Sequence, residues 1–126
     1  MEITNATQAD LSEILRIERL GFTVEEAGTK EQYQDRINKL STTFLVARID
    51  DQVAGFVVGP AIKEKYVEDW MYEKTPDNLS EGGNKIIFTI AVDPKYQGYS
   101  IGSKLLDAIK QNAFIHDRKT GKPNTL

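Results

Sequence analysis

The segment IAVDPKYQGYSIGSKLL, residues 90–106, carries the strongest structural pattern in this sequence. It begins at the end of the most apolar segment, residues 86–92, in which every residue except Thr89 is apolar. Because both faces of such a strand are apolar, we expect it to be central in a sheet and covered on both sides. Pro94 then predicts a turn, and a short loop containing Gly98 leads into an amphipathic helix over residues 100–113.

A helix that begins directly after a glycine-containing loop can bind an anion. The N–H groups of its first turn have no partner and lie at the positive end of the helix dipole. A diphosphate placed there would meet several N–H donors without any basic side chain. A side chain at Gly98 or Gly102 would hold the phosphates away from the backbone. Similar junctions also occur as plain packing turns, so the spacing leaves both an anion site and a packing turn open.

The remaining elements are predicted from helical and β periodicity. In order, we expect a strand at residues 3–5, helices at 7–20 and 29–40, strands at 43–49, 53–58 and 86–92, and the helix at 100–113. Thr29 and Gln32 form a capping-box pattern, and the acidic pair Asp50–Asp51 separates two β-rich runs as a hairpin turn would. This order predicts the fold class α+β (mixed α/β), an antiparallel sheet with helices.

Composition limits the classes of function. The chain has 126 residues, 40% apolar and 28% charged, with a formal net charge of −3, which suits one domain over residues 1–126. Without a Lys/Arg-dense block we expect no nucleic-acid partner, and without cysteine no thiolate metal site or thiol nucleophile. With the single histidine His116 and no EF-hand spacing, we expect no metal. No signal segment or membrane-spanning run is present, so we expect a cytoplasmic protein without a membrane partner.

Residues 92–106 resemble the acetyl-CoA signature of the GNAT acetyltransferases, V-x-P-x-Y-Q-G-x-G-I-G-x-x-L-L. The proline, glutamine, glycines and di-leucine fall in register, and the order of elements upstream extends the resemblance over residues 1 to about 113. Residues 55–60 and 81–83 further resemble the bacterial branch related to aralkylamine N-acetyltransferases.

The resemblance implies an acyl-CoA N-acyltransferase-like fold and an acetyl-CoA-dependent N-acetyltransferase acting on a small primary amine. Acetyl-CoA would be a co-substrate, with its pantetheine arm paired to one strand and its pyrophosphate on the loop and helix start. The cofactor-binding residues so implied are Ile90, Ala91, Val92, Gln97, Gly98, Tyr99, Ser100, Ile101, Gly102 and Ser103, and the acceptor amine would approach near Phe22. The alternatives are a catalytically silent acyl-CoA-binding or assembly module, and an interaction domain whose glycine loop only packs.

The sequence departs from the family pattern in two places. Ser100 replaces a glycine, and serine disfavours the positive φ that a glycine loop adopts. Family members also continue past the last helix with a strand, a helix and a hairpin, including the tyrosine that protonates the CoA thiolate. The resemblance therefore implies a domain truncated after that helix, with residues 113–126 as a flexible tail. An uncovered edge at residues 86–92 would then join a homo-oligomer, such as a dimer.

No general base stands out, so the catalytic residues stay unassigned. Family members often carry a Glu or His on the strand before the signature, where this chain has only Thr89. The alternatives, each expected to be a solvated surface charge, are Glu18, Glu25, Glu26, Asp69 and Glu73. Residues 63–84 predict a long connection with short helical pieces or a lid, in which Trp70 and Tyr72 either line an acceptor pocket or pack on the core.

Overall fold

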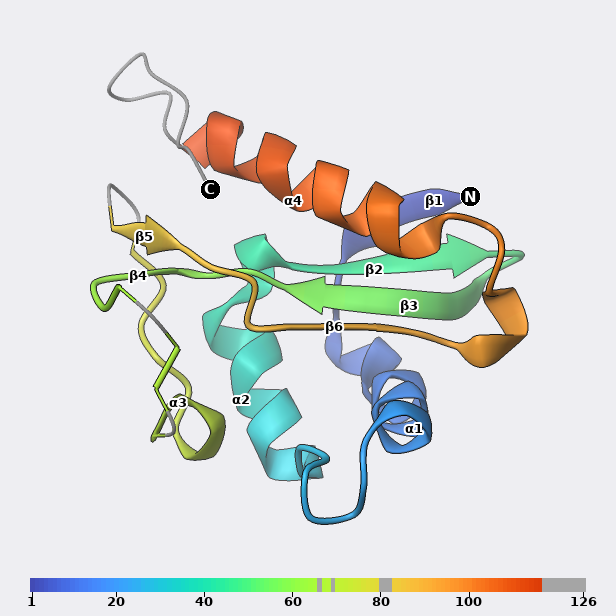
Figure 1. Ribbon diagram of the computed structural model, residues 1–126, viewed down its shortest axis with the longest axis horizontal. Coiled ribbons are helices and arrows are strands. Elements are labelled where there is room, and N and C mark those ends of the chain that lie inside the picture. The colour runs from blue at the N-terminus through green and yellow to red at the C-terminus, as the bar shows by residue number, and fades with distance from the viewer. Residues whose placement is uncertain (66, 69, 80–82, 117–126) are drawn as a thin grey trace.

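The computed structural model of the chain describes residues 1–65, 67–68, 70–79 and 83–116 (Figure 1). Its strands are β1 (Glu2–Asn5), β2 (Phe44–Ile49), β3 (Gln52–Val58), β4 (Ala61–Ile62), β5 (Asn84–Lys85) and β6 (Thr89–Val92). Its helices are α1 (Leu11–Gly21), α2 (Lys30–Lys39), α3 (Trp70–Glu73) and α4 (Ile101–His116), with 3-10 turns at Gln8–Asp10, Ser41–Thr43 and Pro94–Tyr96. No helix among these residues is both long and apolar enough to cross a membrane.

The main sheet has the order β1-β2-β3-β6, and each neighbouring pair is antiparallel. Helices α1 and α2 lie on one face of this sheet and α4 on the other (Figure 1). Strands β4 and β5 form a separate small ladder. The predicted class, a mixed α/β fold with an antiparallel sheet, is therefore confirmed.

Local signals in the sequence located the element boundaries well. Asp50 and Asp51 have φ of 51° and 64°, the pair of positive values that a type I′ hairpin turn requires. The Thr29 hydroxyl accepts the Gln32 N–H at 3.2 Å, and the Gln32 side chain accepts the Thr29 N–H at 2.9 Å, so the capping box of α2 is confirmed. Leu20, by contrast, is 56% exposed, although it follows the buried Ile17 at helical spacing on α1.

The apolar segment 86–92 behaves differently from the expectation of a central strand. Only Thr89–Val92 pairs with β3, and β6 is the edge strand of the main sheet in the described part of the chain. Both faces are nevertheless covered, because Ile90 packs on the core under α4 and Ala91 on the core under α1 and α2. A strand with apolar residues on both faces is therefore covered by helices on both faces. This pattern does not show whether the strand is hydrogen-bonded on both edges.

Two segments of the sequence prediction extend beyond the described residues. The long connection contains the short helix α3, as expected for its helical pieces, while its residues 66, 69 and 80–82 lie outside the description. Helix α4 runs through His116, and the rest of the predicted tail, residues 117–126, also lies outside it.

Candidate functional site

The loop between β6 and α4 is held in place by Asp93. This side chain is buried, and its Oδ1 accepts the backbone N–H of Lys95 at 3.0 Å while its Oδ2 pairs with Arg16 Nη2 at 2.9 Å. Burial alone would raise the pKa of Asp93, but the hydrogen bonds from Lys95 and Arg16 outweigh it and lower that pKa. Asp93 therefore stays ionised and ties the end of β6 to α1.

The backbone after Asp93 opens toward solvent. Gly98 has a φ of +90° and Ser100 a φ of +57°, so two left-handed residues turn the chain into α4. A Cβ built on Gly98 would meet no atom within 4 Å, which leaves free space beside this backbone. Gln97, Tyr99 and Ser103 are also exposed, whereas Ile101 is buried against the sheet.

The start of α4 offers backbone donors at this open loop. Its first helical hydrogen bond runs from Lys104 N to Ser100 O at 3.1 Å. The N–H groups of Ile101, Gly102 and Ser103 therefore have no acceptor within the helix. Together with the positive end of the helix dipole, they favour an anion, which is one of the two alternatives that the spacing of the sequence left open for this loop.

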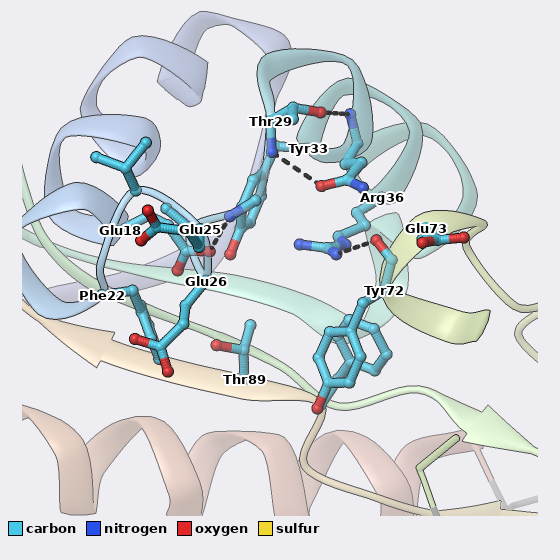
Figure 2. A pocket seen from close by; sticks show the side chains of 15 residues that line it. Glu18, Phe22, Glu25, Glu26, Thr29, Tyr33, Arg36, Tyr72, Glu73 and Thr89 are labelled. Carbon is cyan, nitrogen blue, oxygen red and sulfur yellow. Dashed lines mark hydrogen bonds between the residues drawn. The ribbon is translucent and has the colours of Figure 1, made fainter. Parts of the chain in front are cut away.

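A cavity of about 400 Å³ lies on the opposite face of β6 from α4, between α1, α2 and α3 (Figure 2). Phe22, the predicted substrate-binding residue, lines it, as does Thr89 at the start of β6. Four candidate carboxylates from the sequence line it as well: Glu18, Glu25, Glu26 and Glu73. The fifth, Asp69, lies outside the described residues.

Glu18 corrects the expectation that each of these carboxylates is a solvated surface charge. Its side chain is only 4% exposed, and its Oε2 accepts the backbone N–H of Gly28 at 2.8 Å, while Oε1 has no partner. Glu25, Glu26 and Glu73 are exposed, as expected. Glu26 accepts the Thr23 hydroxyl at 2.8 Å, which lowers the pKa of that carboxyl.

Two further residues of the cavity, Tyr33 and Arg36, were missed as site residues. Both are buried, and Arg36 Nη2 donates to the Tyr72 carbonyl at 3.1 Å. The guanidinium also lies 4.6 Å from the centre of the Tyr33 ring. The available signal was a charge within an apolar stripe: Glu18 follows Ile14 by one helical turn, and Arg36 lies one turn after Tyr33.

The two aromatic residues of the long connection take different places. Tyr72 lines the first cavity and its ring contacts Phe88, with centroids 4.9 Å apart. Trp70 instead lines a second cavity of about 550 Å³, together with Lys39, Lys63 and Lys74. Of the two alternatives left open for these aromatics, lining a pocket or packing on the core, Tyr72 fits both, whereas Trp70 borders a different cavity.

A family model and several solved structures match this chain. The model of the acetyltransferase (GNAT) family matches residues 10–120. Among solved structures, a GphF GNAT-like decarboxylase in complex with isobutyryl-CoA is 14% identical, with a TM-score of 0.77 over 91% of this chain and 60% of its own. The loading GNATL domain of CurA from Lyngbya majuscula is 15% identical, with a TM-score of 0.73 over 89% of this chain and 57% of its own.

A GNAT family acetyltransferase from Brucella melitensis in complex with acetyl-CoA is 21% identical, with a TM-score of 0.58 over 95% of this chain and 70% of its own. At these identities the structures show a shared fold. The chain spans about 60% of the length of the first two structures. No curated protein matches it.

Proposed function

Because the chain belongs to the acetyltransferase (GNAT) family, we propose that it is an acetyl-CoA-dependent N-acetyltransferase that acts on a small primary amine. The observation that carries this proposal is the junction of β6 and α4. There, Gly98 and Ser100 take positive φ values beside open space, and the free N–H groups of the first turn of α4 follow at once.

This junction fits the diphosphate of CoA. Negative oxygens are stabilised at a helix N-terminus, and a glycine with no atom near its Cβ position allows close approach to the backbone. Among the described residues, β6 pairs with β3 alone. The N–H and C=O groups on its other edge, at Ile90, Ala91 and Val92, can pair with the amides of the pantetheine arm. The cavity reaches the same strand at Thr89, so the thioester and the amine would meet beside β6.

The proposed reaction is an acyl transfer. The neutral amine nitrogen forms a bond to the acetyl carbonyl carbon, the C–S bond breaks, and the CoA thiolate takes up the proton that the nitrogen loses. Amines of the lysine type have a pKa of about 10.4, so an acceptor ammonium must first lose a proton at neutral pH. The carboxylates of the cavity can bind that ammonium and receive its proton.

Thermal unfolding with CoA, acetyl-CoA and desulfo-CoA tests the proposal, together with release of CoA thiol in the presence of simple amines. We expect all three ligands to raise the unfolding temperature, because each binds only the folded chain. Amine-dependent thiol release from acetyl-CoA would support catalysis. Binding without thiol release would favour the silent acyl-CoA-binding module, and no binding would favour the interaction domain.

The Ser100→Gly variant is expected to bind CoA at least as tightly as the wild type. A serine with φ of +57° is strained, so the change should also raise the free energy of unfolding by about 0.5 kcal/mol after the entropy of glycine is subtracted. Calorimetry and urea unfolding check both values. A large loss of affinity would mean instead that the hydroxyl donates to a phosphate.

A homo-oligomer, such as a dimer joined near residues 86–92, is a further part of the proposal. In the described part of the chain β6 pairs only with β3, and Ile86, Ile87 and Ile90 are half-buried. An open edge of this kind favours pairing with another chain. The pantetheine arm would use the same edge, so we expect light scattering to show an oligomer that dissociates when CoA is added. A monomer at every concentration without CoA would contradict this.

Several narrower features of the protein stay predictions from the sequence. They comprise a relation to the aralkylamine branch, a cytoplasmic location, and no nucleic-acid or membrane partner.

A further inference from the structure

Three polar atoms of the 400 Å³ cavity are buried without a hydrogen-bond partner: Glu18 Oε1, Tyr33 Oη and Arg36 Nε. They are the complete set of such side-chain atoms in the described part of the chain. A buried polar atom without a partner is costly, and a buried charged group more so. Their gathering in one cavity, from α1 and α2, indicates that a ligand supplies the missing partners.

The Tyr33 hydroxyl has a negatively charged side chain on one side and a positively charged side chain on the other. Figure 2 shows the Tyr33 hydroxyl between the carboxylate of Glu18 and the guanidinium of Arg36. Neither Glu18 nor Arg36 belongs to an ion pair within the described residues. The carboxylate can therefore accept from a cation, and the guanidinium can donate to an anion, without first breaking a bond between them.

The Tyr33 hydroxyl keeps its proton. Burial raises the pKa of Tyr33 well above its usual value, and the nearby Glu18 carboxylate raises it further, while Arg36 acts in the opposite direction. The phenol therefore stays protonated and can complete a site for a carboxylate next to Arg36.

We propose that the acceptor is an α-amino acid, whose ammonium is bound by Glu18 and whose carboxylate is bound by Arg36 and Tyr33. This inference deepens the proposed function and rests on it. An ammonium and a carboxylate on one carbon atom present a donor and an acceptor side by side, which matches the two unpaired charges. A simple monoamine would leave Arg36 Nε unpaired, and a diamine would bring a second positive charge toward the guanidinium.

Glu18 would also be the first group to receive a proton from the bound ammonium. Its carboxylate lines the same cavity as Thr89 of β6, next to the edge proposed for the thioester. Transfer of one proton from the ammonium to Glu18 leaves a neutral nitrogen, which then forms the C–N bond as the C–S bond breaks.

The test compares L-leucine with 3-methylbutylamine, the same molecule without its carboxylate. Binding to the CoA-loaded protein is measured by calorimetry, and kcat/KM by release of CoA thiol. We expect the amino acid to bind at least about tenfold more tightly than the amine, because only the amino acid satisfies Arg36 and Tyr33. Equal affinity for both ligands, or preference for the amine or for 1,4-diaminobutane, would overturn the proposal.

Two variants locate the interactions. Glu18→Gln keeps the shape of the side chain and an acceptor for Gly28 but removes the charge, so it should weaken binding of both ligands about tenfold or more. Arg36→Lys should reduce the preference for the amino acid to less than about threefold, because lysine lacks the planar fork of donors. Glu31→Gln, an equal change of charge at an exposed position of α2 that does not line this cavity, is the matched control and should change affinity less than about twofold.

Failure of this inference and failure of the proposed function give different results. If CoA binds and amines are acetylated but Glu18→Gln binds leucine like the wild type, the proposed function stands and the amino-acid site is wrong. If CoA does not bind, calorimetry with leucine on the free protein still tests the site: no heat of binding would overturn it as well. If Arg36→Lys does not fold, the proposal is tested by the comparison of leucine with 3-methylbutylamine and by Glu18→Gln.

Discussion

The Gly98→Val variant is expected to lose CoA affinity by at least about 100-fold while the chain still folds. Gly98 has a φ of +90°, a conformation that a β-branched residue adopts only at a cost, so the loop would shift. The new side chain would also fill the open space beside the backbone in which the diphosphate is proposed to lie. Because a Cβ there contacts nothing, the rest of the fold should be retained.

Variants at two other glycines distinguish backbone strain in the loop from steric obstruction of the diphosphate. Gly102 has no positive φ, and a Cβ there would only touch Val92 at 4.0 Å, so loss of CoA binding in Gly102→Val would report obstruction alone. Gly21, at the end of α1, is also free of neighbours, and Gly21→Val is the control that should bind CoA normally. Calorimetry on the three variants checks the expectation, and unchanged affinity in Gly98→Val and Gly102→Val would rule out the anion site.

The Asp10→Asn variant is expected to lower the free energy of unfolding by about 3 kcal/mol at pH 7. Arg48 on β2 donates two hydrogen bonds to the buried Asp10 carboxylate, from Nη1 to Oδ1 at 2.8 Å and from Nη2 to Oδ2 at 2.7 Å. The same carboxylate accepts the Thr7 N–H at 2.9 Å, so it joins the start of α1 to the sheet. An amide cannot accept both guanidinium bonds, and it leaves the partly buried cation without its counter-ion.

The same pair gives the stability of the wild type a defined pH dependence. Burial would raise the pKa of Asp10, but the bonds from Arg48 and Thr7 outweigh it and hold the pKa below its usual value. A lowered folded-state pKa means that the stabilisation is fully present above the unfolded value of about 3.9 and is lost as pH falls through the folded-state pKa.

Urea unfolding of the wild type and Asp10→Asn at pH 7 and near pH 3 measures this effect. The difference between them should shrink as the pH falls, because protonated Asp10 no longer attracts Arg48. Asp35→Asn is the control: Asp35 forms an exposed pair with Lys39 at 3.6 Å, and its loss should change stability by less than about 0.5 kcal/mol. A difference of that small size for Asp10→Asn would show that the buried pair contributes little.

Features that depend on neighbours in the sequence could be predicted from the sequence. The capping box at Thr29, the hairpin turn at Asp50–Asp51 and the entry into α4 each depend on the chemistry of a few consecutive residues. The positive φ of Gly98 belongs to the same group, since glycine alone adopts it without strain. These features determined the order of elements and the position of the loop that is proposed to bind the diphosphate.

The cavity between α1, α2 and α3, by contrast, depends on the tertiary structure. Glutamate is usually found on protein surfaces. Glu18 is buried because the loop at Gly28 and the helix that carries Tyr33 and Arg36 pack against α1. The edge position of β6 likewise depends on which strands pair. Strand pairing and the burial of Glu18 are set by groups far apart along the chain. The spacing of Glu18 within the apolar stripe of α1 indicated the helix face on which it lies, but not the loop and the helix that cover it.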